Sequence, residues 1–415
     1  MKRSLQAHSL LSVAATVIVV CSTCLPATAQ FLVVTNDNNE IGNSTTIFQA
    51  SGPASAPSLN KLISFKTSGT GAFPLSLGSV LQTIVPQGPT SFCLFVSNGG
   101  TLDVAAIIGD LATGTGGPVG VFHGSGADGS IPGTMALAAS PDGNYLYVAF
   151  NGANNIATFK IATGCGLTFV QDNSVSGPNG GRPIAMAASP GFGSTGSILA
   201  VAYSDGSIES LSISGGITVR NGDLQFSNLF KLYGSIPQSV DITQDGHYAI
   251  FGDAPGARGH TDVEVYDISS GHLGTNTSYH GGTGLFGSPD GSSNIRLSPN
   301  EQLLYVSNNH SGQVTALGFN KNNGSLFFGC TSASLKGFES YWYFTAGIAT
   351  ALPTGSGSVL WVAEDAVVTG TNGIGTVLVG SANGTCTLTE AANSPESDTL
   401  GGALTSLSAF PLRPF

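Results

Sequence analysis

The chain has 415 residues, of which only 9% are charged, and its 13 lysines and arginines are outnumbered by 24 aspartates and glutamates. The net charge of −11, with no basic cluster along the sequence, argues against nucleic acid and anionic membrane surfaces as partners. The 58 glycines indicate many tight turns, as in a protein built from short strands.

The first segment has the three parts of a secretory signal peptide. Lys2 and Arg3 precede an apolar run over 10–20, and the small-residue sequence Ala27–Ala29 follows. We expect a signal peptide over residues 1–29, cleaved after Ala29, and a secreted or periplasmic product. No later stretch approaches ~18 uninterrupted apolar residues, so we expect no transmembrane segment after signal cleavage. Residues 30–415 are long enough for one large domain.

A set of short motifs recurs along this domain every 49 to 55 residues. Its fullest copy is Ser140–Gly143 followed by Leu146–Val148 and Ile156–Ile161, and a second close copy begins at Ser298. Weaker copies begin at Ser189, Thr243 and Leu352. Pro-Asp-Gly favours a turn, because Pro presets φ and Gly tolerates positive φ. Repeats of this length, each containing four short strands, predict a β-propeller.

Seven blades can be placed in chain order. The first has strands over 31–36, 44–49 and 59–66 but lacks an innermost strand, and the second is marked by Phe92–Asn98. The other five blades begin near Thr134, Pro183, Ser239, Asn294 and Tyr343. The segment 403–411 looks like an innermost strand with nothing after it, so pairing it with the first blade would close the ring. The predicted fold is all-β, a seven-bladed β-propeller of four-stranded antiparallel blades in which the C-terminal strand completes blade 1.

The alternating strand direction sorts the loops onto two ends of the ring. If the strands of a blade are lettered A to D from the centre outward, the B–C loops and the D–A links between blades lie at one end, which we call the B–C/D–A end. Propellers commonly bind ligands where such loops converge. The candidate ligand-face residues at this end are Arg182, Asp253, His310, Tyr341, Trp342 and Glu364. We expect Asp253 and Glu364 to be exposed and to attract a cation or a hydroxyl-rich ligand.

Several of these candidates also have plainer interpretations. Asp253 belongs to a polar run whose other charged members are Arg258, His260, Asp262 and Glu264. For this run, a solvated loop with local ion pairs is favoured over a ligand or Ca²⁺ contact. The aromatic run 341–344 fits alternating burial in a strand better than an aromatic platform for a ligand. His310 is better explained as a rim residue satisfied by its neighbours than as an acid–base group.

No metal or cofactor site is predicted. The seven histidines show no H-x-x-x-H spacing, and neither Cys-x-x-Cys nor G-x-S-x-G occurs after the signal segment. The four cysteines of the mature chain are an even number, which permits disulfides in an exported protein. Three pairings are possible, and Cys93–Cys165 with Cys330–Cys386 is geometrically the simplest because each bridge would join adjacent blades. Free buried thiols are the alternative.

The run Asn294–Pro299 followed by Leu304–Asn308 resembles the seven-bladed lactonase-like propellers, which include 6-phosphogluconolactonases, carboxymuconate cyclases and the YVTN-repeat surface proteins. The resemblance covers all seven blades in the spacing of their motifs and is close in sequence for blades 3 and 6. In the catalytic branches, a Pro-Arg-His link precedes strand A of one blade and a Glu follows its strand B. An Arg follows the Ser-Asn of a later blade, and a His lies in an earlier one.

The chain departs from this catalytic pattern at each position. Pro237–Ser239 stands at the Pro-Arg-His link, and Ala254 stands at the Glu position, with Asp253 as the nearest acid. Asn309 replaces the Arg, and the stretch 133–134 replaces the His. Without the Arg, no fixed cation would hold a carboxylate or an oxyanion, and without the His and Glu no obvious group would transfer a proton. The resemblance therefore implies the fold but not the family mechanism.

Two classes of function stay open. The favoured one is an exported, non-catalytic binding or interaction module, a monomer without a cofactor, that takes a small molecule, glycan or protein at the B–C/D–A end. The alternative is a hydrolase that acts on a lactone or related ester with a diverged active site. The negative net charge argues against an anionic phosphosugar such as 6-phosphogluconolactone as the ligand.

Overall fold

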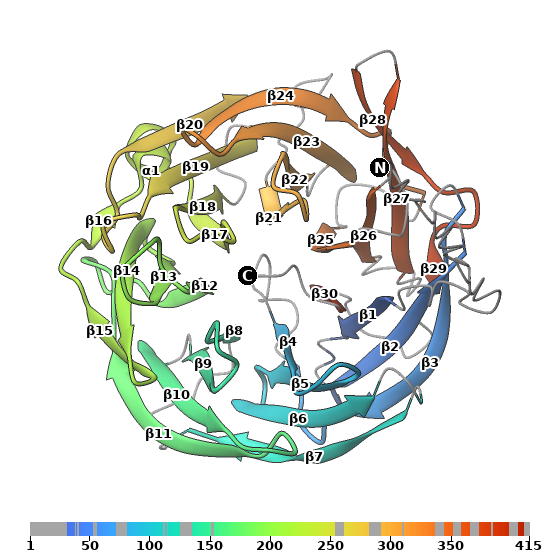
Figure 1. The fold of residues 1–415 in the computed structure, drawn as a ribbon, viewed down its shortest axis with the longest axis horizontal. Coiled ribbons are helices and arrows are strands. Elements are labelled where there is room, and N and C mark those ends of the chain that lie inside the picture. The colour runs from blue at the N-terminus through green and yellow to red at the C-terminus, as the bar shows by residue number, and fades with distance from the viewer. Residues whose placement is uncertain are drawn as a thin grey trace, which may run out of the picture.

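The computed structural model shows seven antiparallel sheets arranged as the blades of a closed ring, seen face-on in Figure 1. This confirms the predicted all-β, seven-bladed β-propeller. The predicted signal peptide lies outside the described residues. The structure describes residues 31–37, 39, 41–52, 56–71, 81–110, 113, 115–124, 135–150, 153–253, 261–281, 292–308, 311–336, 344–351, 358–365, 373–382, 385–397 and 406–410.

The strands of each blade follow one another from the centre outward as A, B, C and D. Blade 1 consists of β30 (Ser406–Phe410), β1 (Phe31–Asn36), β2 (Ser44–Ser51) and β3 (Ser58–Lys66). Blade 2 consists of β4 (Gln82–Pro86), β5 (Ser91–Asn98), β6 (Asp103–Asp110) and β7 (Thr115–His123). Blade 3 consists of β8 (Met135–Ala139), β9 (Tyr145–Phe150), β10 (Asn155–Ile161) and β11 (Leu167–Ser174). Blade 4 consists of β12 (Pro183–Ser189), β13 (Ile198–Tyr203), β14 (Ser207–Ser214) and β15 (Ile217–Arg220). Blade 5 consists of β17 (Pro237–Ile242), β18 (Tyr248–Asp253), β19 (Thr261–Asp267) and β20 (Asn276–Gly281).

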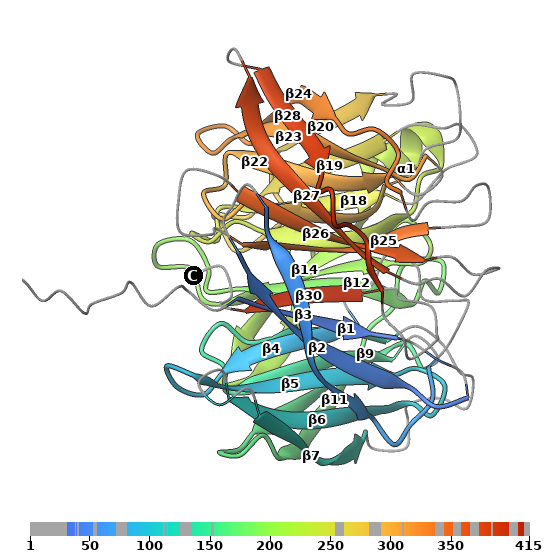
Figure 2. The same cartoon turned by 90° about the vertical axis from the view of Figure 1, so that its right-hand side faces the viewer.

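Blade 6 consists of β21 (Ser292–Leu297), β22 (Leu303–Asn308), β23 (Gln313–Asn320) and β24 (Ser325–Thr331). Blade 7 consists of β25 (Phe344–Ala351), β26 (Ser358–Asp365), β27 (Gly373–Ala382) and β28 (Thr385–Glu390). Two short strands join strand C of their blades, β16 (Gln225–Phe226) in blade 4 and β29 (Glu396–Ser397) in blade 7. The helix α1 (Asn228–Tyr233) lies in the link from blade 4 to blade 5, and the side view in Figure 2 places it at one rim of the ring. Among the described residues, no helix has the length and apolar character needed to span a membrane.

The ring is closed by the C-terminal strand, as predicted. β30 pairs antiparallel with β1, with Leu32 opposite Phe410 and Asn36 opposite Ser406, and Figure 1 shows the two strands side by side. Leu407 of β30 is buried in one apolar cluster with Val33 of blade 1 and residues of blade 7. Blade 1 thus takes its innermost strand from the far end of the chain, and β1 is paired on both sides.

The recurring motif forms the turn between strands A and B. The hydroxyl of Ser140 accepts a hydrogen bond from the backbone N–H of Tyr145 at 2.9 Å, and a hydroxyl begins the corresponding turns of blades 5 and 6 with the same bond. Such bonds tie the two strands together at the turn. The fourth residue of the motif adopts a positive φ, as predicted, at Gly143 (69°), Gly246 (70°) and Glu301 (54°).

The core of the protein is divided among the blade interfaces. Seven apolar clusters each lie between two neighbouring blades and together follow the whole ring. The strand B runs supply much of this core, because a strand packed on both faces by neighbouring blades is apolar along its length. In β9, for example, Leu146, Tyr147 and Val148 are all fully buried.

Two disulfides join adjacent blades. Cys93 of β5 is bonded to Cys165 in the C–D turn of blade 3, with a Cα–Cα distance of 5.3 Å. Cys330 of β24 is bonded to Cys386, with a Cα–Cα distance of 5.5 Å. These are the two bridges that the blade order favoured. Cys386 is the second residue of β28.

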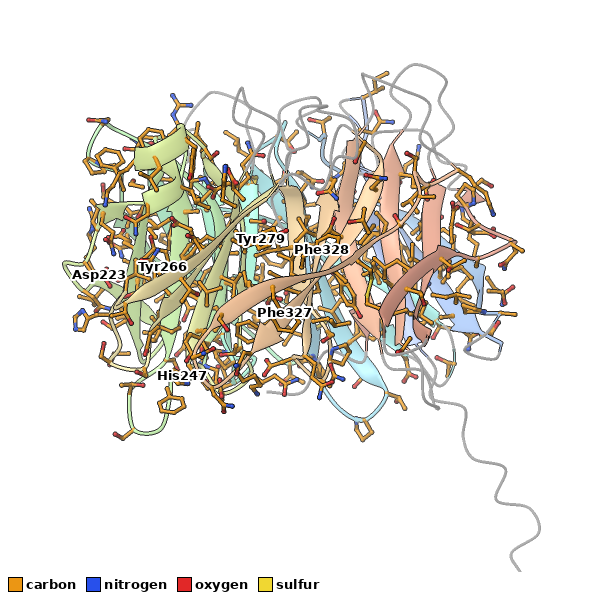
Figure 3. All side chains as sticks on the ribbon, turned by 90° about the horizontal axis from the view of Figure 1, so that it is seen from above. Asp223, His247, Tyr266, Tyr279, Phe327 and Phe328 are labelled. Carbon is orange, nitrogen blue, oxygen red and sulfur yellow. A yellow bond between two sulfur atoms is a disulfide. The ribbon has the colours of Figure 1, made fainter. Side chains whose placement is uncertain are left out.

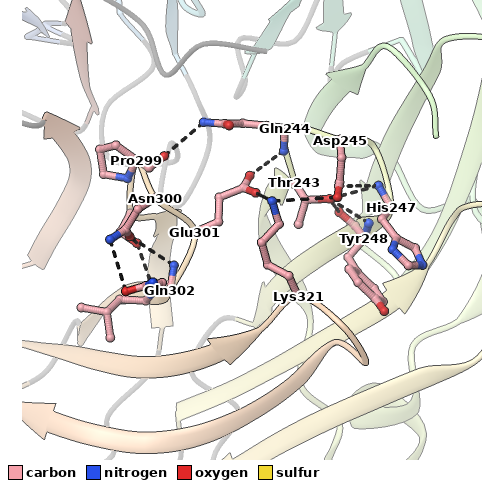
Figure 4. A network of polar contacts seen from close by, with 12 residues as sticks. Thr243, Gln244, Asp245, His247, Tyr248, Pro299, Asn300, Glu301, Gln302 and Lys321 are labelled. Carbon is pink, nitrogen blue, oxygen red and sulfur yellow. Dashed lines mark hydrogen bonds and ion pairs between the residues drawn. The ribbon is translucent and has the colours of Figure 1, made fainter. Parts of the chain in front are cut away.

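Blades 5 and 6 are further held together by polar contacts at the A–B turn end, drawn in Figure 4. The buried carboxylate of Glu301 accepts a hydrogen bond from the backbone N–H of Gln244 and pairs with Lys321 at 2.5 Å. The side chain of Gln244 donates to the carbonyl of Pro299 at 3.2 Å. Asp241 of β17 also lies 3.7 Å from Arg296 of β21, so charge pairs bridge the innermost strands of the same two blades.

Candidate functional site

The sequence-predicted candidates that the structure describes lie at the B–C/D–A end, but in three different blades. Asp253 is the last residue of β18 in blade 5, and Glu364 lies near the end of β26 in blade 7. Arg182 precedes β12 in blade 4, where its backbone N–H donates to the hydroxyl of Ser204 at 2.9 Å. His310, Tyr341 and Trp342 lie outside the described residues. As members of a ligand site, all six residues stay predictions.

Asp253 and Glu364 are not exposed, contrary to the sequence expectation. Only 1% of Asp253 and 2% of Glu364 is accessible to solvent. In blade 5, Asp253 lies directly opposite Pro237 in the register of β17 and β18, so the D–A link enters the blade beside it. Burial raises the pKa of Asp253 well above its usual range, and the neighbouring Glu264 and Asp262 raise it further. Asp253 is therefore a carboxyl group that favours its protonated form.

The interpretation of this polar run as a solvated loop is wrong for its acidic members. Asp262 and Glu264 belong to β19, and they are only 3% and 0% exposed. Glu264 accepts hydrogen bonds from the hydroxyl of Tyr266 at 2.8 Å and from the backbone N–H of Leu229 at 2.5 Å. Burial nevertheless raises the pKa of Glu264. Arg258 and His260 lie outside the described residues.

The helix α1 covers these acids and places two further side chains beside them. The hydroxyl of Ser227 caps the helix by accepting from the N–H of Phe230 at 3.0 Å. Gly234 ends the helix in the left-handed conformation with a φ of 73°. The chain then turns back across blade 5, so that Tyr233 and Ser235 both reach the outer part of the acid cluster.

His280 completes the cluster and is its main opening to solvent. It lies opposite Asp262 in the register of β19 and β20, with 2.5 Å between its Nδ1 and the Asp262 Oδ1. The other carboxylate oxygen of Asp262 accepts from the hydroxyl of Ser235 at 3.0 Å. The ring of Tyr233 stacks on the imidazole with 3.9 Å between centroids and an interplanar angle of 1°. The His280 side chain is 28% exposed, against 4% for Asp262.

This arrangement combines three chemical properties in one place. Asp262 fixes the orientation of the imidazole through Nδ1, so Nε2 is the nitrogen through which His280 can exchange a proton. The buried acids can accept or donate hydrogen bonds, according to their protonation state. The Tyr233–His280 stack is a flat aromatic surface. Such a site can hold a small hydroxyl-bearing ligand and can also move a proton.

Sequence reasoning found Asp253, Asp262 and Glu264 but missed His280, Tyr233 and Ser235. His280 carried no signal of its own, because its place beside Asp262 becomes known only from the register of β20 with β19. Within the residues that the structure describes, no group of three or more His, Cys, Asp or Glu side chains could hold a metal ion.

A second polar system in blade 4 has a similar plan. Glu209 of β14 is fully buried, accepts a hydrogen bond from the hydroxyl of Tyr203 and pairs with Arg220 at 3.0 Å. Burial raises the pKa of Glu209 despite these partners. Because Arg220 also donates to the carbonyl of Ser176 in the link from blade 3, this group ties two blades together. Its role is structural.

No family model matches this sequence, and no curated protein matches it. Several solved structures match over most of the chain. The periplasmic gluconolactonase PpgL of Pseudomonas aeruginosa has a TM-score of 0.65 and 15% identity, with 92% of this chain and 98% of that chain covered. A Bacteroides fragilis protein proposed to be a 6-phosphogluconolactonase has a TM-score of 0.64 and 16% identity, with 92% and 99% covered.

A functionally unknown protein of Desulfotomaculum acetoxidans is also similar, with a TM-score of 0.56 and 15% identity over 88% of this chain and 100% of that chain. At such identities a likeness shows the fold and not the activity. It agrees with the resemblance drawn from the repeated sequence motifs. The chain therefore has the seven-bladed β-propeller fold of the gluconolactonase-like structures.

Proposed function

We propose that the protein is an exported, lactonase-like propeller that binds a small, uncharged, hydroxyl-rich ligand at the B–C/D–A end of blade 5. The observation that carries this proposal is the Tyr233–His280 stack, held by Asp262 at the partly exposed edge of a buried acid cluster. An aromatic face beside oriented polar groups is the combination that a sugar-like ring requires. The proposal keeps the binding role that the sequence favoured.

The charge of the site supports an uncharged ligand. Asp262 contacts His280 of the stack, Asp253 and Glu264 belong to the same acid cluster, and only His280 carries a titratable base among the cluster residues described above. An anionic ligand would meet these carboxyl groups, and the cation whose charge acts on Glu264, Lys231 of α1, is exposed rather than held in the cluster. A neutral hydroxylated ligand can hydrogen-bond to the partly exposed imidazole of His280 without that penalty.

Export is part of the proposal and has its own support. Both disulfides join adjacent blades, and structural disulfides persist in oxidising compartments. The Lys2–Ala29 segment has the parts of a signal peptide. Expression of the full chain in a bacterial host, followed by fractionation and N-terminal sequencing, should place the mature protein outside the cytoplasm with its first residue at Gln30.

A second candidate function is hydrolysis of a lactone, and one observation favours it. The His280–Asp262 pair can act as a general base toward water, and Asp253 is a nearby carboxyl group whose raised pKa suits a proton donor. The residues differ from those of the family pattern, so this would be a diverged active site.

One set of measurements separates the two functions. Residues 30–415 are titrated calorimetrically with uncharged sugar lactones and the corresponding lactams, and hydrolysis of each lactone is followed in parallel. We expect Tyr233→Ala to weaken binding by roughly tenfold, from the loss of a stacking contact of about 1 kcal/mol or more. Tyr279→Ala, which truncates the aromatic residue next to His280 on the other face of β20, should leave affinity unchanged.

The outcomes are distinct. Binding without hydrolysis supports the binding function, whereas hydrolysis that His280→Gln abolishes supports the enzyme. If no member of the panel binds the wild-type protein, or if Tyr233→Ala and Tyr279→Ala behave alike, the site has been assigned wrongly.

A further inference from the structure

A polar groove of about 270 Å³ lies between blades 5 and 6, on the outer part of the ring at the A–B turn end. It is remote from the acid cluster, and Figure 3 shows His247 at the edge opposite to the helix α1. Its walls come from the start of β18, from β19 and β20, and from the C–D turn of blade 6. The lining residues are His247, Tyr248, Val265, Asp267, Thr275, Asn276, Thr277, Asn322, Asn323 and Gly324.

The groove is preformed by a tight turn. Gly324 ends the C–D turn of blade 6 with a φ of 67°, and a Cβ at this position would lie 2.9 Å from the ring of Tyr248. Only glycine adopts this conformation easily and lets the turn approach so closely. The hydroxyl of Thr277 donates to the Gly324 carbonyl at 2.7 Å and fixes the two blades against each other. A preformed groove binds its ligand without first losing conformational entropy.

One wall of the groove is an aromatic stack. The imidazole of His247 lies between Phe192 and Tyr248, with centroid distances of 4.4 and 4.0 Å. Its Nε2 lies 3.6 Å from the Oδ2 of Asp267. Burial alone would raise the pKa of Asp267, but the hydrogen bonds from Ser269 and the nearby His247 outweigh burial and lower that pKa. The groove therefore presents an ionised acceptor beside a held imidazole.

The lining selects against charged ligands. It contains neither lysine nor arginine, and the nearby Lys321 is paired with Glu301 at 2.5 Å. A phosphate or carboxylate would find no lysine or arginine in this lining and would meet the carboxylate of Asp267, which lies 3.6 Å from His247. The remaining polar groups are amides and hydroxyls, which both donate and accept hydrogen bonds. The volume is slightly below the range of about 300–1,000 Å³ typical of drug-sized ligands.

We infer that this groove is a second binding site, and that it takes one uncharged sugar ring of a carbohydrate. The ring would lie against the His247 wall and share its hydroxyls between Asp267 of blade 5 and the amides of Asn322 and Asn323 of blade 6. This site is separate from the proposed blade 5 site, and it gives the propeller one carbohydrate contact at each end.

The test uses residues 30–415 with their disulfides intact and measures binding by saturation-transfer NMR and calorimetry. The probes are the methyl glycosides of glucose, galactose and mannose, with glucuronate and glucosamine as the charged counterparts. We expect at least one neutral glycoside to bind, and Asp267→Asn to weaken it about tenfold or more through loss of a charged acceptor. Asn322→Ala, on the exposed turn of the other blade, should weaken binding by a smaller factor.

Asp110→Asn is the matched control, because Asp110 ends strand C of blade 2 as Asp267 ends strand C of blade 5. It should leave sugar affinity unchanged. The inference is overturned if no neutral glycoside binds the wild-type protein, or if a charged sugar binds more tightly than its neutral counterpart. It is also overturned if Asp267→Asn and Asn322→Ala, both shown to be folded by circular dichroism, bind like the wild type.

Discussion

The buried carboxyl of Asp253 should make the free energy of unfolding of the propeller depend on pH. The variant Asp253→Asn measures how much of this pH dependence is due to Asp253. In the native state burial raises the pKa of Asp253, while in the unfolded chain the group returns to an ordinary aspartate pKa of about 3.9. Between the two values the native state keeps a proton that the unfolded state has lost. The free energy of unfolding therefore falls as pH rises through this window, and Asp253 contributes no further slope above its native pKa.

The magnitude follows from linkage. While Asp253 is protonated in the native state and ionised in the unfolded state, one bound proton changes the free energy of unfolding by about 1.4 kcal/mol per pH unit. Asparagine keeps the size of the side chain and does not titrate. The free energy of unfolding of Asp253→Asn, minus that of the wild type, should therefore increase with pH above about 4 and become constant once the native pKa is passed.

The assay is urea unfolding followed by tryptophan fluorescence at each half unit from pH 4.5 to pH 8.5, with the disulfides kept oxidised. Ser239→Ala is the control, because Ser239 is buried on the neighbouring strand β17 and has no titratable group in this range. It should shift the whole pH curve without changing its slope. Parallel curves for Asp253→Asn and the wild type would refute the argument that Asp253 stays protonated in the folded protein.

Three further predictions concern the ring itself. Removal of residues 406–415 deletes β30 and uncovers β1 and the inner edge of blade 7, so the product should be insoluble, as judged by centrifugation and gel filtration; a soluble, compact product would contradict it. Replacing Cys330 and Cys386 together by serine should lower the free energy of unfolding by about 4 kcal/mol, from the loop-entropy relation for a separation of 56 residues, and an unchanged denaturant midpoint would count against it. Gly206→Ala should destabilise the protein by about 2 kcal/mol, because Gly206 has a φ of 84° and a Cβ there would meet the ring of Phe230; thermal unfolding measures this, and a wild-type melting temperature would disprove it.

The ring could be predicted from the sequence because the motifs that form its turns are short, local and repeated. The Ser140–Gly143 motif specifies a turn by side-chain chemistry, and the same chemistry returns in blades 5 and 6. Blade 1 without an innermost strand, together with an unpaired strand at the other end, left one way to close the ring. The number of blades and the closure of the ring therefore followed from counting repeats.

The burial and the side-chain contacts of the candidate site could not be predicted in the same way. The sequence shows that Asp253 ends a strand, but not that the link containing α1 folds back over blade 5. Burial of Asp262 and Glu264 depends on that cover, and so does the raised pKa of Glu264. Tyr233 and His280 are far apart in the chain and meet only through the helix and the β19–β20 register. Each of these contacts is tertiary, and no local pattern encodes it.

The pairing of β30 with β1 also has a consequence for the order in which the protein can fold. Blades 2 to 7 are each made of consecutive strands, so their hairpins close short loops and can form one after another. Blade 1 alone joins strands from opposite ends of the described chain, and this pairing has the highest contact order in the ring. The entropic cost of closing so long a loop is offset only when Leu407 packs into the apolar cluster between blades 1 and 7. During biosynthesis, β1 to β3 emerge first and must wait, as an incomplete sheet with an open inner edge, until the last strand has been made.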